Sequence, residues 1–211
     1  MPSDEADVFL EPADPVTVEE KIKRSLFIAC LYPCRTVEAF RKILSEVESV
    51  YKEANHHCWA YCLGPDPEIV HSSDDGEPSG TAGKPILASI RQSGMVNLAV
   101  VVTRYFGGIK LGVRGLIEAY GRVSGLAASK VERIVKTPSR GLVIRLPYDI
   151  IGEVTHLLNI CGTVGVPEWV YGADVEVFAD VKSSSECRLT LALDELRARN
   201  RIHSWSWFSP N

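Results

Sequence analysis

The chain of 211 residues lacks a long apolar run and a strong net charge, which is −4. The longest apolar run in its middle, residues 98–102, is far shorter than the roughly 20 residues that a membrane-spanning helix needs. The first residues are acidic, whereas a signal peptide begins with a basic segment followed by an apolar one. We therefore expect a cytoplasmic protein that has no membrane partner.

Familiar catalytic motifs are absent as well. The sequence has no G-x-S-x-G nucleophile elbow, no H-E-x-x-H zinc motif and no kinase signature. The Gly83-Lys84 pair is not a Walker loop, because Pro78 stands where that motif has its first glycine and Pro85 where it has Ser or Thr. We favour a non-enzymatic role and predict no catalytic residue and no cofactor.

The six cysteines are expected to be reduced thiols, because no secretion signal accompanies them. Cys30 and Cys34 are four residues apart, as are Cys58 and Cys62, so on a strand each pair would point to one face. Two such pairs could build a tetrahedral zinc site. Structural zinc sites usually have tighter spacing and both pairs lie in apolar runs, so we favour buried thiols and predict no metal.

Charge is distributed unevenly along the chain. Residues 1–83 hold 7 Lys/Arg against 16 Asp/Glu, residues 84–136 hold 9 against 2, and residues 137–211 hold 7 against 9. A basic central segment is the kind of surface that attracts phosphate even when the whole molecule is acidic. The alternative is that the acidic segment neutralises the basic one within a single folded surface.

The first two thirds of the chain mix strands and helices. Residue types and spacing indicate strands at 16–22, 25–32, 56–63 and 96–103, helices at 37–52, 81–91 and 112–133, and an interrupted strand at 134–144. Thr36 is the expected N-cap of the first helix, and a Gly-Pro turn at 64–67 ends the third strand. The strand at 96–103 is apolar at nearly every position, so we expect both its faces to be buried.

The last third has a different order of elements. We expect a strand at 142–146, a helix at 148–161, strands at 163–171 and 173–181, a helix at 184–200 and a strand around Trp205. This βαββαβ order is the ferredoxin-like signature, in which two helices cover one face of an antiparallel sheet. The predicted fold class is therefore α+β, with domains at 1–138 and 139–211. Ser183 to Ser185 would cap the second helix.

Three aromatic residues follow near the C-terminus. Trp205, Trp207 and Phe208 could stack on bases or dock a partner. Such residues more often close a small core, and we favour that role here.

Two glycine-rich loops carry opposite charge. The first, at 71–85, is acidic, and the second, at 103–115, is basic. The glycines of the second loop would let backbone N–H groups approach a ligand, and the N-terminus of the following helix adds the positive end of its dipole. A phosphate group suits this composition best. The candidate anion-binding residues are Arg104, Gly107, Gly108, Lys110, Arg114 and Lys84.

Both loops also have structural interpretations. The glycines of the basic loop could serve a tight turn, with its arginines paired to acids of the first loop, and for the glycines we favour this role in shape. Asp74, Asp75 and Glu77 could hold Mg²⁺ or act as general acid and base, but turn and N-cap hydrogen bonds explain them well.

Three histidines lie near these acids in the sequence. His56, His57 and His71 could join them as metal ligands. Adjacent residues on a strand point to opposite faces, so His56 and His57 could not both bind one ion without distortion. We therefore assign His57 to the core.

Separate blocks of residues in one order carry a family resemblance. They are 57–61, 74–78, 80–83, 97, 100–108, 110–112, 115–116 and 119–120. These blocks resemble the family named for eukaryotic IMPACT and bacterial YigZ. The resemblance implies an N-terminal α/β domain related to domain IV of elongation factor G, followed in bacterial members by a ferredoxin-like domain similar to its domain V. Many members have a small residue at position 114 and a basic one where Glu118 stands, so charge is shifted within the motif here.

The resemblance also bears on function. Eukaryotic members act as translational regulators by competing for an activator of an initiation-factor kinase, a role that we do not carry over to this chain. We predict a non-enzymatic protein that associates with RNA or the ribosome through the basic central region and modulates translation, without DNA specificity. One alternative is a phosphate- or nucleotide-binding enzyme in which Asp74, Asp75 and Glu77 hold a metal in a glycine-rich cleft. A second is a protein-docking regulatory module with a protein partner.

Overall fold

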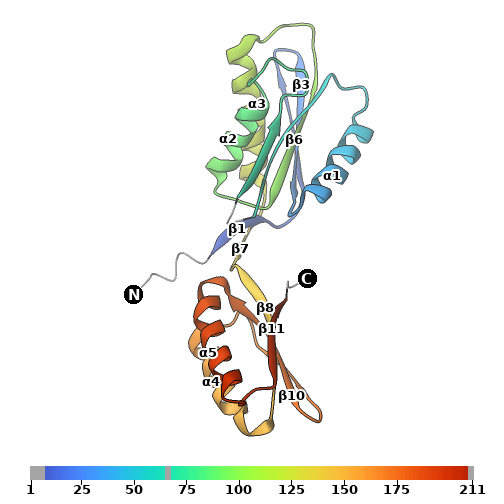
Figure 1. Ribbon diagram of the computed structural model, residues 1–211. Helices are drawn as coiled ribbons and strands as arrows, with labels where there is room; N and C mark the ends of the chain where they lie inside the picture. Colours follow the sequence, from blue (N-terminus) through green and yellow to red (C-terminus); the bar gives the residue numbers. More distant parts are fainter. Residues whose placement is uncertain (1–7, 65–67, 209–211) are drawn as a thin grey trace. The chain divides into compact units, whose positions relative to one another are not determined.

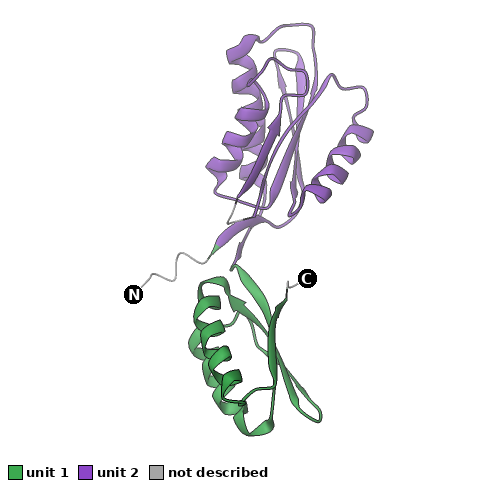
Figure 2. Cartoon of the chain, viewed as in Figure 1, with its two compact units in different colours: residues 1–8, 137–211 green, residues 9–136 purple. Residues whose placement is uncertain are grey.

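The computed structural model describes residues 8–64 and 68–208, so three residues of the turn predicted at 64–67 lie outside the described residues. The chain forms two compact units, Phe9–Lys136 and one that begins at Thr137 (Figure 2). Each unit combines helices with an antiparallel sheet, which confirms the predicted α+β class. No helix among the described residues is long and apolar enough to cross a membrane.

The first unit is built on a five-stranded antiparallel sheet of order β2-β3-β6-β4-β5. Helices α2 and α3 lie on one face of this sheet and α1 lies on the other (Figure 1). The strands are β2 (Val16–Ile22), β3 (Ser25–Pro33), β4 (His56–Leu63), β5 (Ile69–Ser73) and β6 (Leu98–Tyr105), and the helices are α1 (Val37–Val50), α2 (Gly83–Ser93) and α3 (Gly112–Lys130).

The central strand β6 explains the two-sided core. Leu98, Val100 and Val102 pack toward α2 and α3, while Ala99 and Val101 pack toward α1. All five are fully buried, as the near-continuous apolar run predicted. Helix α1 begins after Thr36, whose hydroxyl oxygen accepts a hydrogen bond from Ala39 N at 3.1 Å, so the predicted N-cap is confirmed.

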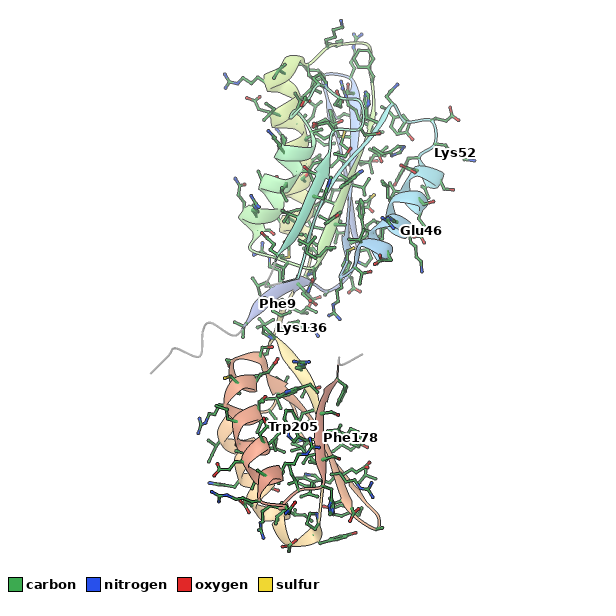
Figure 3. The ribbon with its side chains drawn as sticks, viewed as in Figure 1. Phe9, Glu46, Lys52, Lys136, Phe178 and Trp205 are labelled. Carbon is green, nitrogen blue, oxygen red and sulfur yellow. The ribbon has the colours of Figure 1, made fainter. Side chains whose placement is uncertain are left out.

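Sequence analysis missed the strands β1 (Phe9–Pro12) and β5, whereas the interrupted strand predicted at 134–144 corresponds to β7 (Arg133–Lys136) and β8 (Ser139–Leu146). Strand β5 occupies part of the segment predicted to be the acidic loop, where it pairs with β4 from Trp59↔Ser73 to Leu63↔Ile69. Strands β1 and β7 form a separate two-stranded sheet in which Phe9 lies opposite Lys136 (Figure 3). The missed strands β1 and β5 have five residues or fewer, too short a pattern to distinguish from a loop.

The second unit has the predicted order of elements. It contains β8 (Ser139–Leu146), α4 (Ile151–Cys161), β9 (Glu168–Tyr171), β10 (Val175–Lys182), α5 (Glu186–Ala198) and β11 (Ser204–Phe208). The sheet order is β11-β8-β10-β9, and α4 and α5 cover one of its faces (Figure 1). A 3-10 turn at Tyr148–Ile150 begins the segment that was predicted as one helix.

Some details of this unit differ from the prediction. Strand β9 is shorter than the predicted 163–171, because Gly165 has a positive φ of 80° and interrupts the extended chain. Ser185 does not cap α5 with its side chain, since its hydroxyl donates to the carbonyl oxygen of Cys161. Trp205 and Trp207 pack against the core and donate their indole N–H groups to Asp194 and Thr190 of α5, so the core role is confirmed for both.

The cysteine pairs lie on opposite faces of the first sheet. Cys58 and Cys62 belong to the core beneath α2 and α3, whereas Cys30 and Cys34 belong to the core beneath α1. The four thiols cannot meet at one ion because the sheet separates them. The zinc alternative is therefore wrong on geometric grounds.

Candidate functional site

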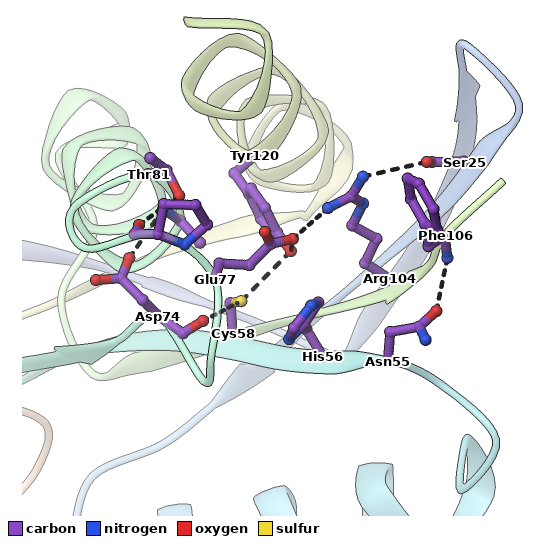
Figure 4. Close-up of polar contacts among 12 residues, drawn as sticks. Ser25, Asn55, His56, Cys58, Asp74, Glu77, Thr81, Arg104, Phe106 and Tyr120 are labelled. Atoms are coloured by element: carbon purple, nitrogen blue, oxygen red, sulfur yellow. Dashed lines mark hydrogen bonds and ion pairs between the residues drawn. The ribbon is translucent and has the colours of Figure 1, made fainter. Parts of the chain in front are cut away.

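A buried ion pair lies where the acidic loop, β6 and α3 meet. Oε1 of Glu77 accepts hydrogen bonds from Nη1 of Arg104 at 2.5 Å and from the hydroxyl of Tyr120 at 2.8 Å (Figure 4). Nη2 of Arg104 donates to the hydroxyl of Ser25 at 3.3 Å. Glu77 and Arg104 are only 8% and 5% exposed. Arg104 is therefore not the surface cation that was expected to contact an anion, and the alternative of pairing with an acidic-loop carboxylate describes it.

One donor of the Arg104 side chain differs from the others. The guanidinium lies between two aromatic rings, 5.4 Å from the centroid of Phe27 and 5.4 Å from that of Phe106. Nη1 and Nη2 are hydrogen-bonded, but the buried Nε is without a partner among the described residues. A buried donor left unpaired is costly and calls for an acceptor.

Cys58 and Tyr120 extend the same network beneath the loop. The Cys58 thiol lies 2.9 Å from the carbonyl oxygen of Asp74 and 3.4 Å from the Tyr120 hydroxyl. Burial raises the pKa of the Cys58 thiol to about 12. Burial, together with the neighbouring Cys58 and Glu77, also raises the pKa of Tyr120. Both groups stay protonated at neutral pH, so neither is an activated nucleophile.

Asp74 caps helix α2 from the preceding loop. Its carboxylate accepts hydrogen bonds from the backbone N–H groups of Gly80, Ala82 and Gly83 at 2.7, 2.9 and 2.9 Å. Burial alone would raise the pKa of Asp74, but these three donors and the nearby Lys84 hold it below its ordinary value. This geometry matches the N-cap interpretation of the acidic loop.

The other polar groups of this loop are also bound within the protein. Asp75 accepts from the backbone N–H of His57 at 2.6 Å, and its carbonyl oxygen lies 2.7 Å from Nδ1 of His56. Nδ1 of His57 lies 3.0 Å from the Thr103 hydroxyl, while the ring of His71 lies against other aromatic rings on β4. No three Asp, Glu, His or Cys side chains in the described part of the chain are grouped to hold a metal.

The basic loop is fixed by close backbone packing. A Cβ added at Gly107 would lie 2.0 Å from the carbonyl oxygen of Arg24, so only glycine fits there. Gly108 has a φ of 81° and needs glycine for its backbone conformation. These contacts support the role in shape that we favoured for the glycines. They also bring the β2–β3 turn against the loop.

Sequence analysis did not name the residues of this turn as candidate site residues. Lys23 and Arg24 form a two-residue turn between the paired residues Ile22 and Ser25, and both have positive φ, 44° and 70°. Such turns favour Asn-Gly, because side chains strain the left-handed region. Two charged residues in a two-residue turn were the available signal, but their position beside Gly107 follows only from the tertiary structure.

The cations around the loop fall into two groups. Lys23, Arg24 and Lys110 are exposed and make no ion pair with the described residues. Arg114 pairs with Glu118 one helical turn on, at 2.8 Å, and both side chains are exposed. Lys84 lies against Gly80 of the acidic loop.

Part of the charge segregation disappears on folding. Central arginines pair with acids of the N-terminal segment in Arg91–Glu68, Arg104–Glu77 and Arg122–Glu20. The alternative of internal neutralisation therefore holds for these three cations. It does not account for the exposed lysine of the loop.

Two cavities flank the start of α3. The larger, about 390 Å³, is lined by Glu77, Pro78, Arg104, Phe106, Lys110, Leu111, Gly112, Val113 and Leu116. The smaller, about 150 Å³, lies between the hairpin turn and α3, and Leu111 lines both. No side chain among the described residues caps the first turn of α3, so its N–H groups are available beside the larger cavity.

The model of the Impact N-terminal domain matches residues 23–128 of this chain. The chain belongs to the IMPACT family. It is 41% identical over 155 residues to the IMPACT family member YigZ of Escherichia coli, covering 72% of this chain and 76% of that protein. It is 41% identical to the IMPACT family member YvyE of Bacillus subtilis over 65% of this chain and 64% of that one.

A solved structure covers almost the whole chain. A crystal structure of a hypothetical protein aligns with a TM-score of 0.66 and 33% identity over 97% of this chain and 98% of that one. The IMPACT family match begins at Lys23 and spans the hairpin turn, the acidic loop, the buried ion pair and the start of α3. The site therefore lies wholly within the part of the chain that defines the family.

Proposed function

We propose that this IMPACT family protein associates with RNA or the ribosome in the cytoplasm, modulates translation, and binds phosphate groups through Lys23, Arg24 and Lys110. The observation that carries the proposal is the packing of the β2–β3 turn on Gly107. This packing brings three cations together around one loop, and none of the three has a carboxylate partner among the described residues. Phosphate oxygens can serve as their counter-charges.

Backbone strain at the turn supports a functional role. Lys23 and Arg24 hold positive φ where Asn-Gly would be more stable, and each such residue costs about 1 kcal/mol. Strain of this kind persists where the charged side chains serve a purpose other than folding. The uncapped start of α3 adds N–H donors and a positive dipole end on the same side of the loop.

The finer domain assignment belongs to the same proposal. We take residues 1–138 as an α/β domain resembling domain IV of elongation factor G and residues 139–211 as a ferredoxin-like domain. The sheet order β11-β8-β10-β9, with the βαββαβ sequence of elements, supports the second assignment. Domains of this kind in a translation factor are consistent with a partner that contains RNA.

The test is co-sedimentation with ribosomes and with RNA between about 50 and 200 mM salt. Charge reversal at Arg104 is unsuitable, because it would break the buried pair with Glu77. The informative variant is Lys23→Asn with Arg24→Gly, which removes two cations and installs the preferred turn residues. It should be more stable than the parent by about 1 kcal/mol and still bind less.

The salt dependence of binding gives the size of the effect that the double variant should have. Each phosphate interaction that a variant removes should reduce the slope of log K against log salt by about 0.7–0.9, so the double variant should reduce it by about 1.5. The matched control is Arg41→Gln with Lys42→Gln, which removes two exposed cations of α1, the helix on the face of the sheet opposite α2 and α3. Equal binding by parent, variant and control would refute the proposal. Binding insensitive to salt would indicate a protein partner instead.

A further inference from the structure

The larger cavity beside the basic loop has features that phosphate binding does not use. Its volume of about 390 Å³ lies within the range of small-molecule sites. Phe106, Leu111, Val113 and Leu116 give it apolar walls, whereas a phosphate group needs only donors and positive charge. An apolar body must therefore accompany any anion that fills it.

The polar groups of this cavity form a matched donor and acceptor. Nε of Arg104 is a buried donor without a partner among the described residues. Both hydrogen bonds of the neighbouring Glu77 carboxylate fall on Oε1, so Oε2 is left as an acceptor for a ligand. Figure 4 shows the two side chains joined by their ion pair, with Phe106 next to Arg104.

These groups fit the chemistry of a nucleobase. The edge of a base presents adjacent hydrogen-bond acceptors and donors, and its faces stack on aromatic rings. Phe106 is 45% exposed and lines the cavity, so its ring can serve as the stacking partner of a base. Lys110 lines the same cavity, and an ammonium group there can hold the phosphate of the same nucleotide.

We propose that this cavity binds a single nucleotide, with the base stacked on Phe106 and hydrogen-bonded to Arg104 Nε and Glu77 Oε2, and the phosphate on Lys110. This inference rests on the proposed function, since both take Lys110 as a phosphate contact. It extends the proposed function by adding a pocket for a base. In an RNA chain, the nucleotide would be an unpaired one, because a base within a duplex is stacked on both faces and its Watson–Crick edge is already paired.

Nuclear magnetic resonance gives a direct test on the full chain. The Arg104 Nε–H group gives its own ¹H–¹⁵N signal, and the backbone amides of Phe106 and Gly112 report on the cavity mouth. The probes are the four nucleoside 5′-monophosphates, with ribose 5-phosphate and inorganic phosphate as probes that lack a base. We expect at least one nucleotide to shift the Arg104 signal, and ribose 5-phosphate to leave it unchanged.

A variant measures the stacking contribution. Phe106→Leu should weaken nucleotide binding by about 5- to 150-fold, the range that stacking on one aromatic side chain provides. Phe208→Leu is the matched control, because Phe208 is also a partly exposed phenylalanine, at 39%, and belongs to the other unit. The control should bind nucleotides like the parent, and thermal unfolding should show that both variants are folded.

The possible outcomes separate this inference from the proposed function. Equal binding of ribose 5-phosphate and the nucleotides would overturn the base pocket and leave the phosphate contacts intact. No shift at Arg104, Phe106 or Gly112 at about 10 mM nucleotide would also overturn it, whatever the co-sedimentation result. Nucleotide binding without any association with RNA or ribosomes would instead support the pocket and refute the proposed function.

Discussion

Replacement of Glu77 by leucine is the sharpest test of the buried ion pair. Glu77 and Arg104 side chains are 4% and 6% exposed, so Glu77→Leu leaves a guanidinium charge unpaired in the core. Breaking one partner of a buried pair costs about 3–5 kcal/mol. The Tyr120 hydroxyl also loses its acceptor, which costs about 1–3 kcal/mol, and the two effects overlap. We therefore expect the free energy of unfolding to fall by about 4–6 kcal/mol.

The assay is scanning calorimetry of the full chain, in which the melting temperature of the first unit should fall by about 10–20 °C. The control is Glu118→Leu, which removes the exposed partner of Arg114 and should cost about 0–1 kcal/mol. The double variant Glu77→Leu with Arg104→Met should be less destabilised than the sum of its single variants, because no buried charge is left unpaired. A Glu77→Leu protein as stable as Glu118→Leu, or strict additivity in the double variant, would refute the reasoning.

Three further predictions concern the loops and the thiols. Asp74→Ala should cost about 2 kcal/mol, since it removes the cap of α2. The pKa of Asp74 is lowered in the folded protein, so the stabilisation by its carboxylate is present above the unfolded pKa of about 3.9 and is lost as pH falls through the folded pKa. In urea unfolding between about pH 5 and pH 2, the variant should therefore lose less stability than the parent. Gly107→Ala should destabilise the protein by about 3 kcal/mol or more, because the new Cβ would lie 2.0 Å from a carbonyl oxygen. Its control, Gly125→Ala within α3, places a Cβ that meets nothing within 4 Å and should stabilise the protein by about 1 kcal/mol. Similar melting temperatures for the two variants would contradict this. Only the exposed Cys187 should react quickly with a thiol reagent in the folded protein, since the other five cysteines are buried and the pKa of Cys58 is raised to about 12. A fast phase of thiol modification that persists in Cys187→Ser would be inconsistent with this.

Long patterns in the sequence predicted the fold well. The strand Val16–Ile22 and the strand His56–Leu63 have the predicted bounds, and the helix after Thr36 begins where its N-cap indicated. Each is long enough for periodicity to separate strand from helix. The short strands β1 and β5 were missed because their pairing partners, rather than their own residues, stabilise them.

The site was predictable only in its parts. Glycines and cations identified the basic loop, and turn and N-cap hydrogen bonds were expected for the acids of the first loop, because both signals are local. The pairing of Arg104 with Glu77 joins residues 27 positions apart, and the contact of Gly107 with Arg24 joins the loop after β6 to the β2–β3 turn. No local pattern indicates which acid or which turn a cation will meet, so Lys23 and Arg24 were not identified as candidates.

Pairing within the fold sorts the central cations by what they do. Arg91, Arg104 and Arg122 each have an N-terminal acid as partner, so their removal should lower stability, most strongly at the buried Arg104. Lys23 and Arg24 have no such partner among the described residues and occupy a strained turn, so their replacement by Asn-Gly should raise stability. Binding and stability should therefore change in opposite directions at the turn. A residue kept only for folding would not show this opposition, which makes it the signature of a functional cation.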